Sequence, residues 1–238
     1  MARPLQQEID KLKNRVLYFS ALVEENVRNT IRALVRRDTK LASKVIDADE
    51  DIDQMEVEVE EHCLKIIALH QPVATDLRFI IAVFNINNDL ERIGDLAVNI
   101  AERAFALASC SEIDIPFDFS GMAEKALTML KNSLDALINL DADLARKVCL
   151  ADEEVDNLNQ EIYSQVEESI RQSPERLDCL IQFPTISAEL ERIADHATNI
   201  AEEVIYLTEG KIVRHQTVEA PNSVPKEGKV MDMTKLLK

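Results

Sequence analysis

Apolar residues recur in steps of three and four along most of this chain. That spacing places them on one face of an α-helix. The first stretch shows the pattern most clearly, at Ile9, Leu12, Val16, Phe19, Val23, Val27, Ile31 and Leu34. It predicts a long amphipathic helix whose apolar face packs against neighbouring helices.

Capping and turn residues mark two further helices in the first half of the chain. Asp38-Thr39 is a typical helix start, so a second helix is expected from about Thr39 to His70. Gln71-Pro72 ends it, because proline cannot continue the hydrogen-bond ladder. A third helix is expected from Thr75-Asp76 to about Ser109.

The same plan follows again after the stretch SCSEIDIPFDFS, which Pro116 interrupts. We expect a helix over 122–140, then a longer one that Asp141 caps, and a turn at Ser173-Pro174. A last helix should run to about Glu209, with Gly210 as its C′ residue.

The second half repeats the first in sequence as well as in plan. DLERIGDLAVNIAE, from Asp89, aligns with ELERIADHATNIAE, from Glu189, at an offset of 100 with ten of fourteen positions identical. VIDADEDID, from Val45, aligns with VCLADEEVD, from Val148, at an offset of 103, so the first copy has three extra residues between its second and third helices. We therefore predict an all-α fold of two tandem three-helix bundles, at residues 1–109 and 110–210, followed by a mobile tail at 211–238.

One residue breaks the equivalence of the two copies. Pro184 stands where the first copy has Phe84. A proline inside a helix kinks or breaks it, so the last helix is expected to bend or to begin late.

Composition agrees with long helices and excludes several functions. Gly and Pro together number only 11 of 238 residues, and aromatics are 4%. The net charge of −17 argues against a nucleic-acid partner, which requires a basic surface, and suits cations or basic protein surfaces. We expect no signal peptide and no membrane span. Cys63, Cys110, Cys149 and Cys179 form no CxxC pair, so we expect reduced thiols in a cytoplasmic protein.

Acidic residues share one helix face in each copy. Glu91, Asp95, Asn99 and Glu102 follow at i, i+4, i+8 and i+11, and Glu191, Asp195, Asn199 and Glu202 repeat them. The preceding helices carry the pairs Asp49 with Asp53, and Asp152 with Asp156. Residues equidistant from an antiparallel turn lie side by side, so each pair should face the glutamate and aspartate of the next helix.

Four converging carboxylates repel one another unless a cation lies among them. Oxygen ligands suit hard ions such as Mg²⁺, Mn²⁺, Ca²⁺ or iron. The asparagines would add ligands or support. The alternative to a metal site is a helix face whose acids are simply exposed to solvent. We assign Glu56, Glu58, Glu60 and Glu61 to such a solvated face. His196, where the first copy has Leu96, is expected to be a packing or rim residue.

The duplicated LERIGDLAVNIAE and LERIADHATNIAE motifs, with ADEDID and ADEEVD before them, closely resemble the PhoU family over about residues 5–210. The resemblance implies two three-helix bundles related by a pseudo-twofold axis. It also implies bound iron, zinc or other divalent ions, at Asp49, Asp53, Glu91, Asp95, Asp152, Asp156, Glu191 and Asp195.

The resemblance further implies a cytosolic, non-enzymatic regulator of phosphate uptake. Such a protein, as a homodimer, couples the ATPase subunit of a phosphate ABC transporter to a membrane sensor histidine kinase. It restrains transport and the phosphate-starvation genes. The alternatives are a carboxylate-bridged metalloenzyme, an oxidase or hydrolase, and a metal-free helical spacer. The oxidase is disfavoured because no Glu has His three residues later.

Overall fold

The computed structural model describes residues 3–110 and 119–213, and every regular element in these ranges is helical. The first repeat comprises α1 (Arg3–Arg36), α2 (Thr39–Asp47), α3 (Asp49–His70) and α4 (Ala74–Ala108). The second comprises α5 (Phe119–Asn139), α6 (Ala142–Gln172), the 3₁₀ turn η1 (Pro174–Arg176), α7 (Leu177–Leu180) and α8 (Gln182–Glu209). No helix of the described ranges has the length and apolarity that crossing a bilayer requires.

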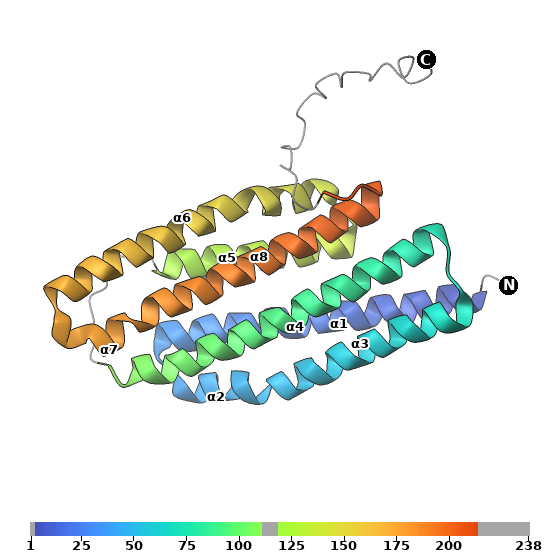
Figure 1. Ribbon diagram of the computed structural model, residues 1–238. Helices are drawn as coiled ribbons and strands as arrows, with labels where there is room; N and C mark the ends of the chain where they lie inside the picture. Colours follow the sequence, from blue (N-terminus) through green and yellow to red (C-terminus); the bar gives the residue numbers. More distant parts are fainter. Residues whose placement is uncertain (1–2, 111–118, 214–238) are drawn as a thin grey trace, which may run out of the picture.

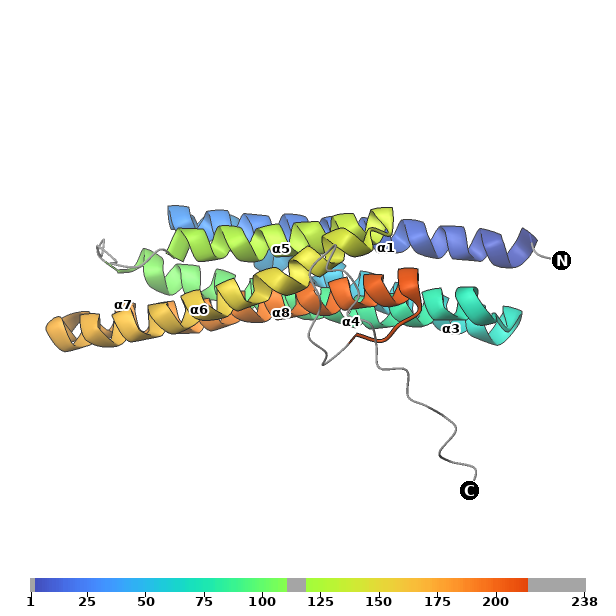
Figure 2. The same cartoon turned by 90° about the horizontal axis from the view of Figure 1, so that it is seen from above.

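The long helices lie along a common direction, and the two repeats pack side by side (Figure 1). The central helices α4 and α8 pack against each other, and α1 also contacts α5. Seen from above, α1 and α5 form one layer over the layer that contains α4 and α8 (Figure 2). The predicted all-α, duplicated fold is confirmed.

The helix starts and ends follow the predicted capping residues. The carboxylate of Asp38 accepts hydrogen bonds from the backbone N–H groups of Lys40 and Leu41, each at 3.1 Å. Asp141 caps α6 in the same way. Gly210 ends α8 with φ 70°, a left-handed conformation in which a side chain would be strained.

The helix expected over 39–70 is not continuous, because Ala48 separates α2 from α3. The break places Asp49, Glu50 and Asp51 in the first turn of α3. Negative side chains are stabilised there by the positive end of the helix dipole. The equivalent α6 of the second repeat runs without a break.

Pro184 lies in the first turn of α8, which begins at Gln182 after the short α7. Backbone N–H groups in a first turn have no partner within the helix, so proline is tolerated there. The late start predicted for this helix is confirmed.

One core runs through both repeats. All eight apolar residues of the predicted α1 face are buried, from Ile9 to Leu34. On α4, Leu90, Ile93, Ala97 and Ile100 are fully buried. These stripes hold the helices in register and so set which polar residues lie side by side on the surface.

The expectation of four reduced thiols is wrong for two cysteines. Cys110, just after α4, forms a disulfide with Cys179 of α7, with the Cα atoms 6.0 Å apart. The two residues are 69 positions apart and meet only because α7 packs near the end of α4. Cys63 and Cys149 are free, and burial raises the pKa of each thiol to about 12.

Most of the tail at 211–238 lies outside the described residues.

Candidate metal centres

The acidic site of the second repeat, site 2, consists of Asp152 and Asp156 from α6 with Glu191 and Asp195 from α8. One carboxylate oxygen from each of Asp152, Asp156 and Asp195 lies within 4.8 Å of the others. The pairing of these two helices therefore brings together acids that the turn geometry predicted to converge.

Burial and mutual repulsion disfavour the ionised form of these acids. Burial, followed by the charges of Asp195 and Asp156, raises the pKa of Asp152 to about 6. This shift persists although the Thr198 hydroxyl donates a hydrogen bond to Asp152 at 3.2 Å. Burial and neighbouring acids also raise the pKa of Glu191 and of Asp195. A bound cation would relieve this repulsion.

Site 1 comprises Asp49 and Asp53 of α3 with Glu91 and Asp95 of α4, and within the described ranges these acids do not form a cluster as tight as that of site 2. Burial, then the charges of Asp53 and Asp95, raises the pKa of Asp49. One carboxylate oxygen of Asp49, Oδ1, is buried and accepts no hydrogen bond within the described ranges. A hard cation is a suitable partner for such an oxygen, so the residues fit a metal.

Arg92 partly neutralises site 1 from its exposed edge. Its guanidinium lies 3.5 Å from Glu91 and 3.2 Å from Asp95. Burial and Asp95 nevertheless raise the pKa of Glu91 against the opposing effect of Arg92. In site 2 the equivalent Arg192 instead pairs with Glu189, at 3.3 Å.

Gly94 allows α3 to approach α4 closely beneath site 1. A Cβ at this position would lie 2.9 Å from Cγ2 of Ile52 and 3.8 Å from Oδ1 of Asp49. The second repeat has Ala194 at the equivalent position. The two helix pairs therefore differ in side-chain volume directly below their acids.

The outer motif residues have different surroundings in the two repeats. Asn99 and Glu102 are exposed, and neither bonds to the acids of site 1 in the described part of the chain. Asn199 donates a hydrogen bond to Asp89 of the first repeat at 3.2 Å. Glu202 lies near site 2, because its charge raises the pKa of Asp152.

Sequence reasoning missed Glu56, which we had assigned to a solvated face. Burial, then Glu60 and Asp53, raises its pKa, and its charge raises the pKa of Glu91. The side-chain amide of Asn87 donates hydrogen bonds to the backbone carbonyl of Glu56 at 3.0 Å and to the Glu56 carboxylate at 3.4 Å. The missed signal was helical spacing, since this residue follows Asp53 by three positions on the same face.

His196 lies between the two repeats. Its Nδ1 is 2.8 Å from Oδ1 of Asp89. A positive charge on this imidazole opposes the burial and the Asp156 charge that raise the pKa of Asp195. The residue thus joins α8 to α4 at the rim of site 2.

The fold and its acids define a class: duplicated three-helix bundles with an acidic face in each repeat. A family model described as the PhoU domain matches residues 16–104 and 119–204, one match in each repeat. The chain belongs to the PhoU family.

Several characterised proteins are similar to this chain over most of its length. It is 37% identical to the phosphate-specific transport system accessory protein PhoU homolog of Aquifex aeolicus, over 90% of this chain and 97% of that protein. It is 35% identical to the corresponding homolog of Pseudomonas putida, over 90% of this chain and 84% of that protein.

Solved structures agree with this relationship. The crystal structure of PhoU from Pseudomonas aeruginosa superimposes with a TM-score of 0.83 at 35% identity, covering 87% of this chain and 99% of that one. The phosphate transport system regulatory protein PhoU from Streptococcus pneumoniae gives a TM-score of 0.76 at 29% identity, covering 88% and 99%.

Proposed function

We propose that this protein is an accessory regulator of a phosphate-specific transport system. The observation that carries the proposal is the set of relatives above, which match 90% of the chain at 35–37% identity and are named for that role. The protein would act in the cytoplasm as a homodimer. It would contact the ATPase subunit of the phosphate ABC transporter and a membrane sensor histidine kinase, and restrain both uptake and the phosphate-starvation genes.

The two acidic sites would hold the metal ions, with iron, zinc, manganese, magnesium or calcium as candidates. Asp49, Asp53, Glu91 and Asp95 would serve site 1. The second set comprises Asp152, Asp156, Glu191 and Asp195. The buried Oδ1 of Asp49 and the raised pKa of Asp152 support this assignment. Bound cations would supply positive charge, stabilise the hairpins and shape the acidic face that partners meet.

Elemental analysis of the purified protein tests the metal assignment. Replacing Glu91 and Asp95 together by alanine should remove the ions of site 1 and leave those of site 2. The matched control replaces Glu50 and Asp51, exposed acids of the same repeat. An unchanged metal content in the site 1 variant would refute the assignment.

Affinity capture from phosphate-replete cells tests the regulatory role. The tagged protein should recover the transporter ATPase or the sensor kinase, and deleting its gene should raise phosphate uptake and starvation-gene expression. Normal uptake and expression in the deletion strain, together with recovery of neither partner, would overturn the proposal.

The converging carboxylates also resemble those of a metalloenzyme. Assays for oxidase and phosphohydrolase turnover with added Fe²⁺ or Mn²⁺ test that alternative.

A further inference from the structure

A second polar site lies between α1 and α3 of the first repeat. It is a cavity of about 640 Å³ that contains four basic side chains, Lys11, Arg15, His62 and Lys65. We call these four residues and the cavity the basic pocket. On α3, His62 follows Asp53 of site 1 by nine positions, which is roughly 14 Å along a helix. The basic pocket is therefore distinct from the acidic site.

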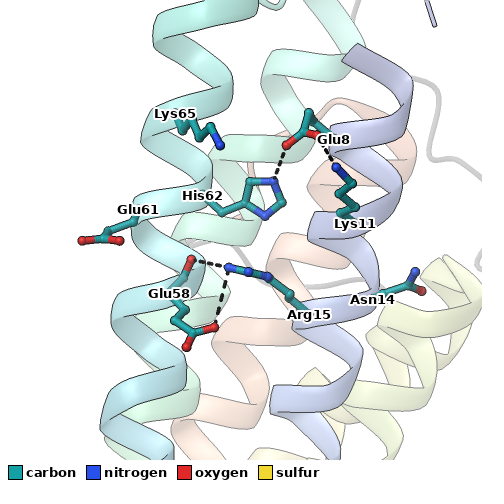
Figure 3. A pocket seen from close by; sticks show the side chains of 8 residues that line it. All are labelled: Glu8, Lys11, Asn14, Arg15, Glu58, Glu61, His62 and Lys65. Carbon is teal, nitrogen blue, oxygen red and sulfur yellow. Dashed lines mark hydrogen bonds and ion pairs between the residues drawn. The ribbon is translucent and has the colours of Figure 1, made fainter. Parts of the chain in front are cut away.

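Acids position two of the basic side chains: Arg15 contacts Glu58 of the facing helix α3, and Lys11 contacts Glu8 of its own helix α1 (Figure 3). The guanidinium of Arg15 donates a hydrogen bond to the backbone carbonyl of Glu58 at 3.1 Å, and its distance to the Glu58 carboxylate is 3.7 Å. The ammonium of Lys11 lies 2.6 Å from Glu8. Both cations are thus oriented by the protein while keeping N–H groups for a further acceptor.

One cation in the pocket lacks such a partner. The ammonium of Lys65 forms no ion pair within the described ranges, and its side chain extends toward His62 and Glu8 in Figure 3. Glu61 points away from the cavity in the same view. A cation in the cavity is therefore available to a ligand.

His62 lines the cavity although it is only 8% exposed. Its Nε2 lies 3.1 Å from Glu8. Its Nδ1 is buried and has no hydrogen-bond partner in the described part of the chain. Buried polar atoms of proteins are nearly always hydrogen-bonded, so this nitrogen indicates a missing partner.

The duplicated fold does not require these bases. The caps Asp38 and Asp141 are equivalent at an offset of 103, yet α1 has 34 residues and α5 only 21. The first turns of α1, which supply Lys11 and Arg15, therefore have no helical counterpart within the described part of the second repeat. At the same offset, His62 and Lys65 correspond to Gln165 and Glu168. The second repeat therefore has no base at the positions equivalent to His62 and Lys65.

We propose that the basic pocket binds the phosphoryl group of a small anion, either inorganic phosphate or a small phosphomonoester. Arginine and lysine donors match tetrahedral oxyanions, and the arginine fork adds geometric specificity. Lys65 supplies positive charge beside the oriented Lys11 and Arg15, and His62 in its doubly protonated form offers its Nδ1–H as a further donor. The cavity volume leaves room for an organic group beyond the phosphoryl oxygens. This inference rests on the pocket alone and does not depend on the regulatory role.

Isothermal titration calorimetry of the full-length protein at constant ionic strength tests the proposal. The probes are inorganic phosphate and, separately, a sugar phosphate. We expect saturable binding of at least one probe, and the stronger of the two identifies the source of the phosphoryl group. Arg15→Gln and Lys65→Gln should each weaken binding about tenfold. Lys125→Gln, a change at a lysine of α5 that pairs with Glu154, should have no effect.

The variants also separate this pocket from phosphate held on metal at the acidic sites. Lys65 is exposed and forms no ion pair in the described ranges, so its replacement leaves the fold intact, which a thermal melt checks. Binding that is equally tight in Lys65→Gln and in the unchanged protein would refute the proposal. Absence of saturable binding by both probes would refute it as well.

Discussion

Replacing Asp152 by asparagine should stabilise the metal-free protein and reduce its response to metal. The pKa of this carboxyl rises from 3.8 to about 6, because the residue is half-buried and faces Asp195 and Asp156. Its folded-state pKa therefore exceeds its unfolded value, and the ionised form is disfavoured in the folded state at neutral pH. Asparagine keeps an acceptor for the Thr198 hydroxyl while removing the charge.

The size of the effect follows from the shift. Each pKa unit corresponds to about 1.4 kcal/mol, so the shift sets an upper limit of about 3 kcal/mol on the gain. Asp152 retains contact with solvent, and screening reduces the free energy to roughly 1–2 kcal/mol. In a chain of this size that corresponds to a rise in Tm of roughly 2–8 °C.

Calorimetric or circular-dichroism melts of chelator-treated and metal-reloaded protein measure both effects. Unmodified protein should gain stability on reloading, and Asp152→Asn should gain less. Glu153→Gln is the matched control, because Glu153 is the exposed neighbour on the same helix. The reasoning fails if the asparagine variant melts below this control without metal, or if its response to metal equals that of the unmodified protein.

Three further measurements test other parts of the structure. In metal-free protein, the contribution of Asp152 to the free energy of unfolding should fall as pH rises from about 4 to about 7; urea titrations of the unmodified protein and Asp152→Asn, compared across this range, isolate it. Reducing the disulfide between Cys110 and Cys179 should lower the free energy of unfolding by about 2–4 kcal/mol, which denaturation with and without reductant measures. Non-reducing peptide mapping that finds both thiols free would contradict the bond. Leu90→Ala should lower the free energy of unfolding by about 2–5 kcal/mol, because the Leu90 side chain is fully buried. Leu69→Ala, at an exposed position, should change it by no more than about 0.5 kcal/mol, and similar losses from both changes would contradict the packing.

Helical periodicity was sufficient to predict the fold and the proximity of three acids of site 2, Asp152, Asp156 and Asp195. The α1 stripe was read correctly because a long helix in a bundle must bury one face. The pairing of Asp152 with Asp195 followed because an antiparallel turn and a constant rise per residue determine which positions lie side by side. The buried face of α1 follows from helix geometry alone, and the pairing of Asp152 with Asp195 requires in addition only the turn between their helices.

Two of the features that the sequence did not predict depend on tertiary contacts. The third, Glu56, would have required the acidic spacing on its helix to be followed one turn further. Glu56 follows Asp53 by three positions on the same helix face, but it lies in a run of acids that we assigned to a solvated face. The disulfide joins Cys110 and Cys179 through the packing of α7 near the end of α4. The basic pocket requires Arg15 and His62, 47 residues apart in sequence, to face each other across two helices.

The duplication leaves the two acidic sites with different electrostatic surroundings. Asp89 meets His196 across the repeats at 2.8 Å, but the reciprocal contact is missing from the described ranges because the equivalent of His196 is the buried Leu96. A positive charge on His196 opposes the burial and the Asp156 charge that raise the pKa of Asp195, whereas the charge of Glu56 helps to raise the pKa of Glu91 in site 1. The two acidic sites therefore differ in their surroundings although they lie on equivalent helices. A total metal count averages over them, and only variants confined to one site can assign an ion to its ligands.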